Sequence, residues 1–147
     1  MTRILGVVSN FGFQMTPAPA VQAYCYIPRL KYGDWVDFLV DTGSSGTCLN
    51  GNNAMPLQAM VSPNTRSPCQ GIGTCDFYYE DAVIVMVDDQ HQPCGKNIRL
   101  GVQCISVSDI QANPRILTTP SLMGRDILCQ CTFECRYNLG EVILTFP

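Results

Sequence analysis

The 147-residue chain has few charged residues, and they are scattered along the sequence. Asp, Glu, Lys and Arg make up 14% of it, well below the usual quarter. The 9 Lys and Arg form no cluster against 12 Asp and Glu, so a surface that follows a nucleic-acid backbone is not expected. We therefore expect no nucleic-acid partner. The low charge also favours a chain that buries additional surface in an oligomer.

Long apolar runs are missing as well. None approaches the roughly 18–20 residues of a membrane-spanning helix. Residues 1–8 contain one basic residue and too short an apolar run for a secretory signal peptide. The one histidine, His91, lies among Asp, Gln and Pro, which is typical of a solvated loop. These absences predict a cytoplasmic protein without a membrane partner and argue against histidine-based nucleophilic catalysis.

Cysteine is abundant, with nine residues, and the odd count does not suit a closed disulfide framework. We expect reduced, mostly buried thiols, with no metal and no cofactor. Cys129 and Cys131 stand too close for the common zinc spacing. Two alternatives stay open. Cys69 and Cys75 could form a disulfide under oxidation, and the chain could be a cysteine-based metal or redox protein.

Short strand-like segments with turn signals dominate the pattern, which predicts an all-β fold built as a closed barrel or sandwich. We expect a single domain over residues 1–147, with residues 1–20 as an N-terminal strand and loop extension. One or two short helices are expected, the first over residues 52–60 and the second from Arg125. Residues 111–119 are predicted to be a loop. The expected strands cover residues 3–8, 21–27, 34–40, 46–49, 76–80, 82–87, 98–107, 132–137 and 141–146.

One acid stands out because an apolar run over residues 35–40 ends in Asp41, followed by Thr42, Gly43 and Ser44. A carboxylate at the end of a buried strand is costly unless it is hydrogen-bonded or used. Hydroxyl and amide donors follow at once and can turn the chain around it. Asp41 is therefore a candidate catalytic acid. The alternative is a capping aspartate in an ordinary turn.

Three features, in this order, make the chain resemble the retropepsin-like aspartic proteases. The first is Leu-Val-Asp-Thr-Gly-Ser at residues 39–44, and the second is the glycine-rich tip Gly71-Ile72-Gly73 between two strands, which is similar to a flap. The third is Leu-Met-Gly-Arg-Asp at residues 122–126, ahead of a short helix. The resemblance implies a homodimeric aspartic endopeptidase that acts on polypeptides and needs no cofactor.

The dimer follows from the chemistry because the chain contains one Asp-Thr-Gly motif and the reaction needs two carboxylates. A symmetric dimer supplies the second Asp41. The resemblance implies that Asp41 is general base in one subunit and general acid in the other, and that Thr42 braces the two turns. It gives Gly43 a backbone carbonyl for substrate and makes Ser44 a support for the carboxylate. Substrate would also contact Gly71, Ile72 and Gly73.

The later segment is expected to support the active-site turn, with Leu122, Met123 and Gly124 beneath it and Arg125 and Asp126 beside it. Retroviral members pair this Arg with an acid at the position of Ser45. Arg125 therefore needs a different ion-pair partner. Apolar subsites are expected from Leu39, Ile72 and residues 82–87. The alternative function is a non-catalytic dimer with this fold that binds extended peptides.

Overall fold

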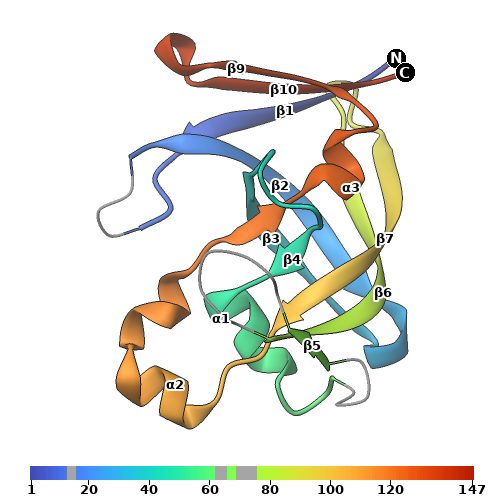
Figure 1. The fold of residues 1–147 in the computed structure, drawn as a ribbon. Coiled ribbons are helices and arrows are strands. Elements are labelled where there is room, and N and C mark those ends of the chain that lie inside the picture. The colour runs from blue at the N-terminus through green and yellow to red at the C-terminus, as the bar shows by residue number, and fades with distance from the viewer. Residues whose placement is uncertain (13–15, 62–65, 69–75) are drawn as a thin grey trace.

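The computed structural model describes residues 1–12, 16–61, 66–68 and 76–147, and most of them lie in one extended sheet (Figure 1). The predicted all-β class is confirmed at this level. The strands are β1 (Thr2–Ser9), β2 (Ala18–Ile27), β3 (Tyr32–Val40), β4 (Cys48–Leu49), β5 (Arg66–Pro68), β6 (Asp76–Val87), β7 (Pro93–Gln103), β8 (Ser121–Met123), β9 (Thr132–Arg136) and β10 (Glu141–Phe146). The α-helices are α1 (Gly51–Ala54), α2 (Val107–Ala112) and α3 (Arg125–Leu128). Short 3-10 turns occupy Pro28–Leu30, Met55–Leu57, Pro114–Thr118 and Tyr137–Leu139.

The strand pairings bring distant parts of the sequence together. The order is β5-β6-β7-β4-β8-β3-β2-β1-β10-β9, and β6 also pairs with β2. Pairings therefore run from β6 through β7, β4, β8 and β3 to β2 and back to β6. Most neighbours are antiparallel, but β3 and β8 are parallel, as are β4 and β7. The parallel pairing of β3 with β8 sets the ends of these two strands next to each other. The two motifs at residues 39–44 and 122–126 begin there.

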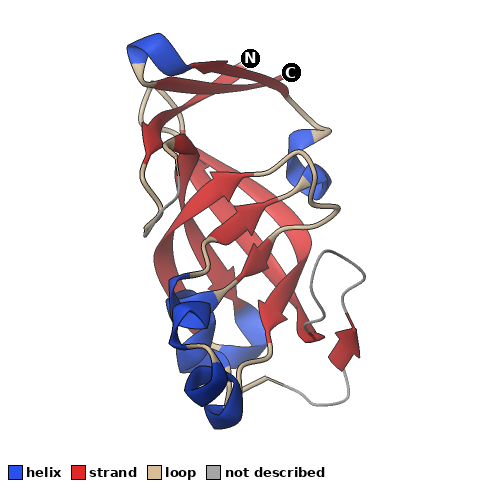
Figure 2. Cartoon of the chain, turned by 60° about the vertical axis from the view of Figure 1, so that its left-hand side comes forward, coloured by secondary structure: helices blue, strands red, loops and turns tan. Residues whose placement is uncertain are grey.

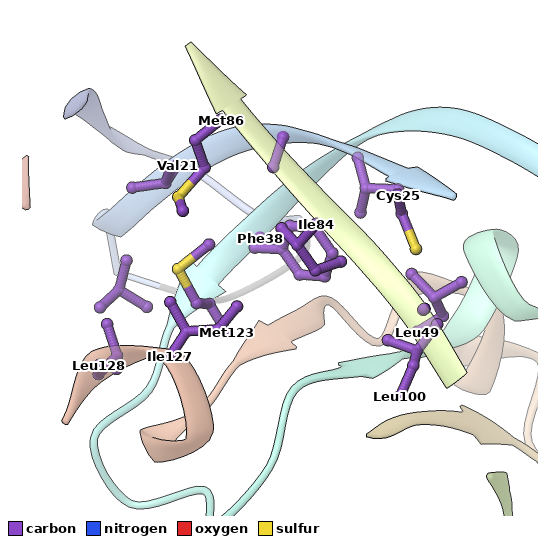
Figure 3. Packing of buried hydrophobic residues seen from close by; sticks show 14 of the residues in the cluster. Val21, Cys25, Phe38, Leu49, Ile84, Met86, Leu100, Met123, Ile127 and Leu128 are labelled. Carbon is purple, nitrogen blue, oxygen red and sulfur yellow. The ribbon is translucent and has the colours of Figure 1, made fainter. Parts of the chain in front are cut away.

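The core lies between the inward faces of these strands. On β6 the side chains alternate, so that Ala82, Ile84 and Met86 are buried while the odd-numbered neighbours are more exposed. This is the period-2 pattern of a strand with one covered face. Phe38 from β3 and Met123 from β8 belong to the same buried cluster (Figure 3). The segments that carry the two motifs are thus anchored in one core.

The first and last strands form one end of the molecule. β1 pairs with β10 from Thr2↔Phe146 to Val7↔Glu141, and β9 flanks β10 on its other side. The two ends of the chain lie together, away from α1 and α2 at the opposite end (Figures 1 and 2). The start of β1, which β2 does not cover, meets the turn after β6, where the Asp89 amide donates to the Arg3 carbonyl at 2.9 Å. The N-terminal strand is therefore an integral part of the sheet.

Several predicted boundaries were wrong; the strand expected over residues 98–107, for example, is β7 and covers Pro93–Gln103. The described residues contain three short α-helices where one or two were expected, because α2 occupies residues assigned to the end of a strand and the start of a loop. Ser106 and Asp109 form a reciprocal capping box at its start, with the Asp109 amide donating to Ser106 Oγ at 3.1 Å. A Ser-x-x-Asp signal was therefore available in the sequence. The predicted strands 76–80 and 82–87 are a single strand, β6.

In the part of the chain that the structure describes, no helix has the length and apolar character needed to cross a membrane. Seven cysteines fall within this part, and no two of them form a disulfide with each other. Cys69 and Cys75, the pair for which a disulfide was considered, lie outside the described residues. Among the described residues, no three His, Cys, Asp or Glu side chains gather as metal ligands.

Candidate active site

Asp41 follows the last residue of β3 and is held there by the parallel neighbour. Val40 is in register with Met123 of β8, and the Asp41 amide donates to the Met123 carbonyl at 3.0 Å. Both flanking side chains are buried, Val40 at 6% exposure and Met123 at 0%. Burial on both strands fixes the register, because a slip by one residue would turn the apolar side chains outward. The acid is therefore placed by the core.

The Asp41 carboxylate is half-buried and only partly satisfied by its own chain. Its Oδ1 accepts a hydrogen bond from the Gly43 amide at 2.8 Å, while the Ser44 amide donates to the Asp41 backbone carbonyl at 3.2 Å. No other described residue donates to the carboxylate. Thr42 and Gly43 are exposed. The turn thus presents an oriented carboxylate with spare acceptor capacity at the surface of a single chain.

The second motif binds the strand that leaves this turn, through Thr47. The Asp126 carboxylate accepts from the Thr47 amide at 3.0 Å and from Thr47 Oγ1 at 2.7 Å. The Gly124 amide in turn donates to Thr47 Oγ1 at 3.0 Å, and the Arg125 amide donates to the Ser44 carbonyl at 3.0 Å. These bonds join two loops that are about 80 residues apart in the sequence. Gly124, Arg125 and Asp126 are thereby bonded to the loop that follows Asp41.

Gly124 is needed at this junction because the two backbones touch. A Cβ on Gly124 would overlap the carbonyl group of Gly46, which is backbone and cannot rotate away. Gly46 itself accepts a hydrogen bond from Ser44 Oγ at 2.7 Å. The Ser44 hydroxyl is therefore directed at its own loop, not at the Asp41 carboxylate that it was expected to support. Its contribution to the site is to fix the loop.

Arg125 was expected to form an ion pair within the chain. Its side chain is exposed, and no ion pair involves it within the described residues. Ser45, at the position where an acid was expected, is exposed as well. The connection between the two motifs is instead made by the neighbouring acid, Asp126. In place of a salt bridge between Arg and an acid, a carboxylate accepts from a threonine.

A pocket of about 300 Å³ opens directly beside the Asp41 turn. One wall is the loop from Ser44 to Cys48, with Asp126 next to it. Phe77 and Tyr79 of β6 and Arg99 and Gly101 of β7 also line it. Apolar and polar groups thus meet in one hollow that adjoins the candidate catalytic acid.

Residues 82–87 do not line this pocket. Residues 82–87 were expected to form an apolar wall, but Ala82, Ile84 and Met86 fill the core instead. The aromatic wall comes from the start of β6, and Arg99 adds a positive charge that the sequence did not single out. No motif marks Arg99, since its position depends on the β6–β7 register. The expected flap residues Gly71, Ile72 and Gly73 lie outside the described residues.

Comparisons with known proteins give a fold and no family. No family model matches the chain, and no curated protein matches it either. Among solved structures, the chain is similar to the crystal structure of a retropepsin-like aspartic protease from Rickettsia conorii. The two share 16% sequence identity with a TM-score of 0.52, over 98% of this chain and 91% of that one. This likeness establishes the fold of the chain.

Proposed function

We propose that the protein is an aspartic endopeptidase that acts as a symmetric homodimer, with one Asp41 from each subunit. The observation that carries the proposal is the Asp41 carboxylate, which is oriented by the Gly43 amide at 2.8 Å and otherwise unbonded among the described residues. The retropepsin-like fold supports it, because the acid occupies the turn between β3 and β4 next to the end of β8. A purely structural acid in this turn would be expected to be saturated.

In the proposed reaction, a water molecule lies between the two Asp41 carboxylates, which share one proton. Two carboxylates this close cannot both be ionised, so one is the base and the other the acid. The base takes a proton from water as the oxygen attacks the peptide carbonyl, and the acid protonates the carbonyl oxygen. As the tetrahedral intermediate collapses, the carboxyl that took the proton from water gives it to the nitrogen and the C–N bond breaks. The other carboxylate takes a proton from a hydroxyl of the intermediate, which restores the shared proton. No covalent intermediate with the enzyme forms.

The exposure of the turn supports the dimer. A single chain leaves Thr42 and Gly43 at the surface, beside an acid with spare acceptor capacity. A second copy related by a two-fold axis would cover these residues and complete the site. Ser44 and the pocket next to it would hold an extended peptide, with Thr42 bracing the two turns and the Gly43 carbonyl accepting from substrate.

The test is cleavage of a peptide library between pH 4 and 7 by the wild type and by Asp41→Asn. We expect the substitution to reduce cleavage by about 10²–10⁴-fold or more, as for loss of an acid–base group. Asp37→Asn is a matched control, because this exposed carboxylate on β3 only accepts from Gln22 Nε2 at 3.1 Å. Cleavage by Asp41→Asn at the wild-type rate would refute the assignment of Asp41.

Subunit mixing tests the shared site. An equal amount of the Asp41→Asn protein should reduce the activity of exchanging wild-type chains to about half, because half of them then pair with an inactive partner. Independent sites in single chains would keep full activity. Sedimentation should give the same dimer for both proteins. If the Asp41→Asn dimer and the wild type both bind peptides and neither cleaves them, the non-catalytic alternative holds.

A further inference from the structure

The pocket beside the Asp41 turn has one strongly basic side chain, Arg99. Its Nη1 donates to Asp81 Oδ1 at 3.0 Å across the β6–β7 pair, and no other described residue pairs with it. A guanidinium has five N–H donors in a planar fork, so most of the donors of Arg99 are available. The Asp81 side chain is 89% exposed, and an ion pair this open to water is readily exchanged.

The acid in the pocket is not available in the same way. Asp126 receives the Thr47 amide and hydroxyl at 3.0 and 2.7 Å and the Ile127 amide at 3.0 Å. These donors compensate its charge and occupy its oxygens. Most of the acceptor capacity of Asp126 is therefore used within the chain, whereas an acidic ligand side chain finds the unused donors of Arg99. Ser45, exposed at the rim, replaces the acid of retroviral members with a hydroxyl.

The other residues of β6 and β7 that line the pocket are two aromatic residues and a glycine. Phe77 is buried at 8% exposure, and Tyr79 lies beside it along the same face of β6. A Cβ on Gly101 would lie 3.1 Å from Phe77 Cδ1 and 3.3 Å from Cys48 Cβ, so a side chain at this position would reduce the space in the pocket. This arrangement suits a side chain with an aliphatic stem and a charged head, the stem against the aromatic wall and the head at Arg99.

From this juxtaposition we propose that the pocket is a specificity subsite for a glutamate of the polypeptide substrate, with Arg99 as the residue that selects it and Asp81 as an internal competitor. The inference rests on the proposed function, since it assigns this pocket to an extended peptide that passes Asp41. The subsite would select a substrate side chain that takes no part in the hydrolysis itself. Arg99 also lines a second hollow of about 360 Å³ together with Asp81, so the guanidinium lies at the boundary of the pocket and this hollow.

The experiment compares kcat/KM for pairs of peptides that differ by Glu or Gln at each position around a cleaved bond. At one position the wild type should prefer Glu by about tenfold, the gain from a charge-assisted hydrogen bond. Arg99→Met should abolish this preference while cleavage of the Gln peptide persists. Asp81→Asn should increase the preference, because the competing carboxylate is gone. Arg136→Met removes a remote cation of the β9–β10 hairpin and should leave the preference unchanged.

The outcomes separate this inference from the proposed function. A wild type that cleaves without a Glu preference, or an Arg99→Met variant that keeps it, overturns the subsite while the protease assignment stands. If the wild type cleaves nothing, the Asp41→Asn protein is titrated with the same Glu and Gln peptides carrying a fluorophore. Tighter binding of Glu that Arg99→Met removes supports the subsite without proteolysis. Equal binding of the two peptides overturns it.

Discussion

Asp41 and Asp126 both lie shortly after the end of a strand, but they differ in how many hydrogen bonds their carboxylates accept. Each follows one of two neighbouring parallel strands, Asp41 directly after β3 and Asp126 at the start of α3 after β8. Asp126 accepts three hydrogen bonds from described residues, two of them from Thr47, whereas Asp41 accepts one, from Gly43. A carboxylate whose acceptors are filled holds loops together. One whose acceptors are left open has capacity for a ligand or a second copy.

The largest effect is expected from removing Asp126, the acid that accepts three hydrogen bonds. Asp126→Ala should lower the free energy of unfolding by about 2–3 kcal/mol, because it leaves the Thr47 amide and hydroxyl without their charged acceptor. Chemical denaturation measures this change. Asp126→Asn retains one carbonyl oxygen and should lose roughly half as much. If Asp126→Ala unfolds at the wild-type denaturant concentration, the loops are held by other contacts.

A thiol in the core extends the contrast between enclosed and open groups. Burial raises the pKa of the Cys25 thiol to about 12, from an ordinary value of 9.0. The folded state therefore keeps this proton while the unfolded chain loses it, so stability is intact below pH 9 and falls between about pH 9 and 12. At pH 10 the loss should be about 1 kcal/mol.

Denaturation from pH 8 to 10 of the wild type and Cys25→Ala checks this slope. The variant should lose less stability over that interval, whatever its stability at pH 8. Exposed Cys129 serves as the control, since Cys129→Ala should leave the slope unchanged. Identical slopes for the wild type and Cys25→Ala would contradict a protonated, enclosed Cys25.

The smallest expected change in stability comes from replacing Asp41. Asp41→Ala should change the free energy of unfolding by less than about 0.5 kcal/mol, because it removes one hydrogen bond from an exposed turn. Denaturation is to be followed under the conditions used for Asp126→Ala. A loss as large as that of Asp126→Ala would make Asp41 a structural residue and remove the contrast on which its proposed role depends.

The sequence predicted the strands and the placement of both motifs well because those depend on local patterns. Alternation on β6 and the apolar run before Asp41 mark their elements directly, and short glycine-containing motifs mark the turns. The capping box of α2 is a local signal too, but the strand expected over residues 98–107 covered its first residue. These features lie within a few residues of their causes.

The pocket and the link between the motifs could not be predicted in this way. Arg99 reaches the pocket because β6 and β7 pair in one register, and a shift of one residue would turn it to the other face. The Thr47–Asp126 bonds depend on how two loops far apart in sequence meet. The expectation that Arg125 would form an ion pair came from the resemblance. In this chain the Asp126 carboxylate connects the two motifs instead.

The pairing of β1 with β10 also has a kinetic consequence. Thr2 and Phe146 are partners, so the most distant residues of the sheet must meet before it is complete. A chain being synthesised can form the β2–β3 and β6–β7 hairpins early, but the pairing of β1 with β10 waits for almost the whole sequence to emerge. Long-range pairing of this kind slows folding and prolongs the time for which strand edges stay open to other chains. Closure by the last strand is therefore the step at which folding competes with aggregation.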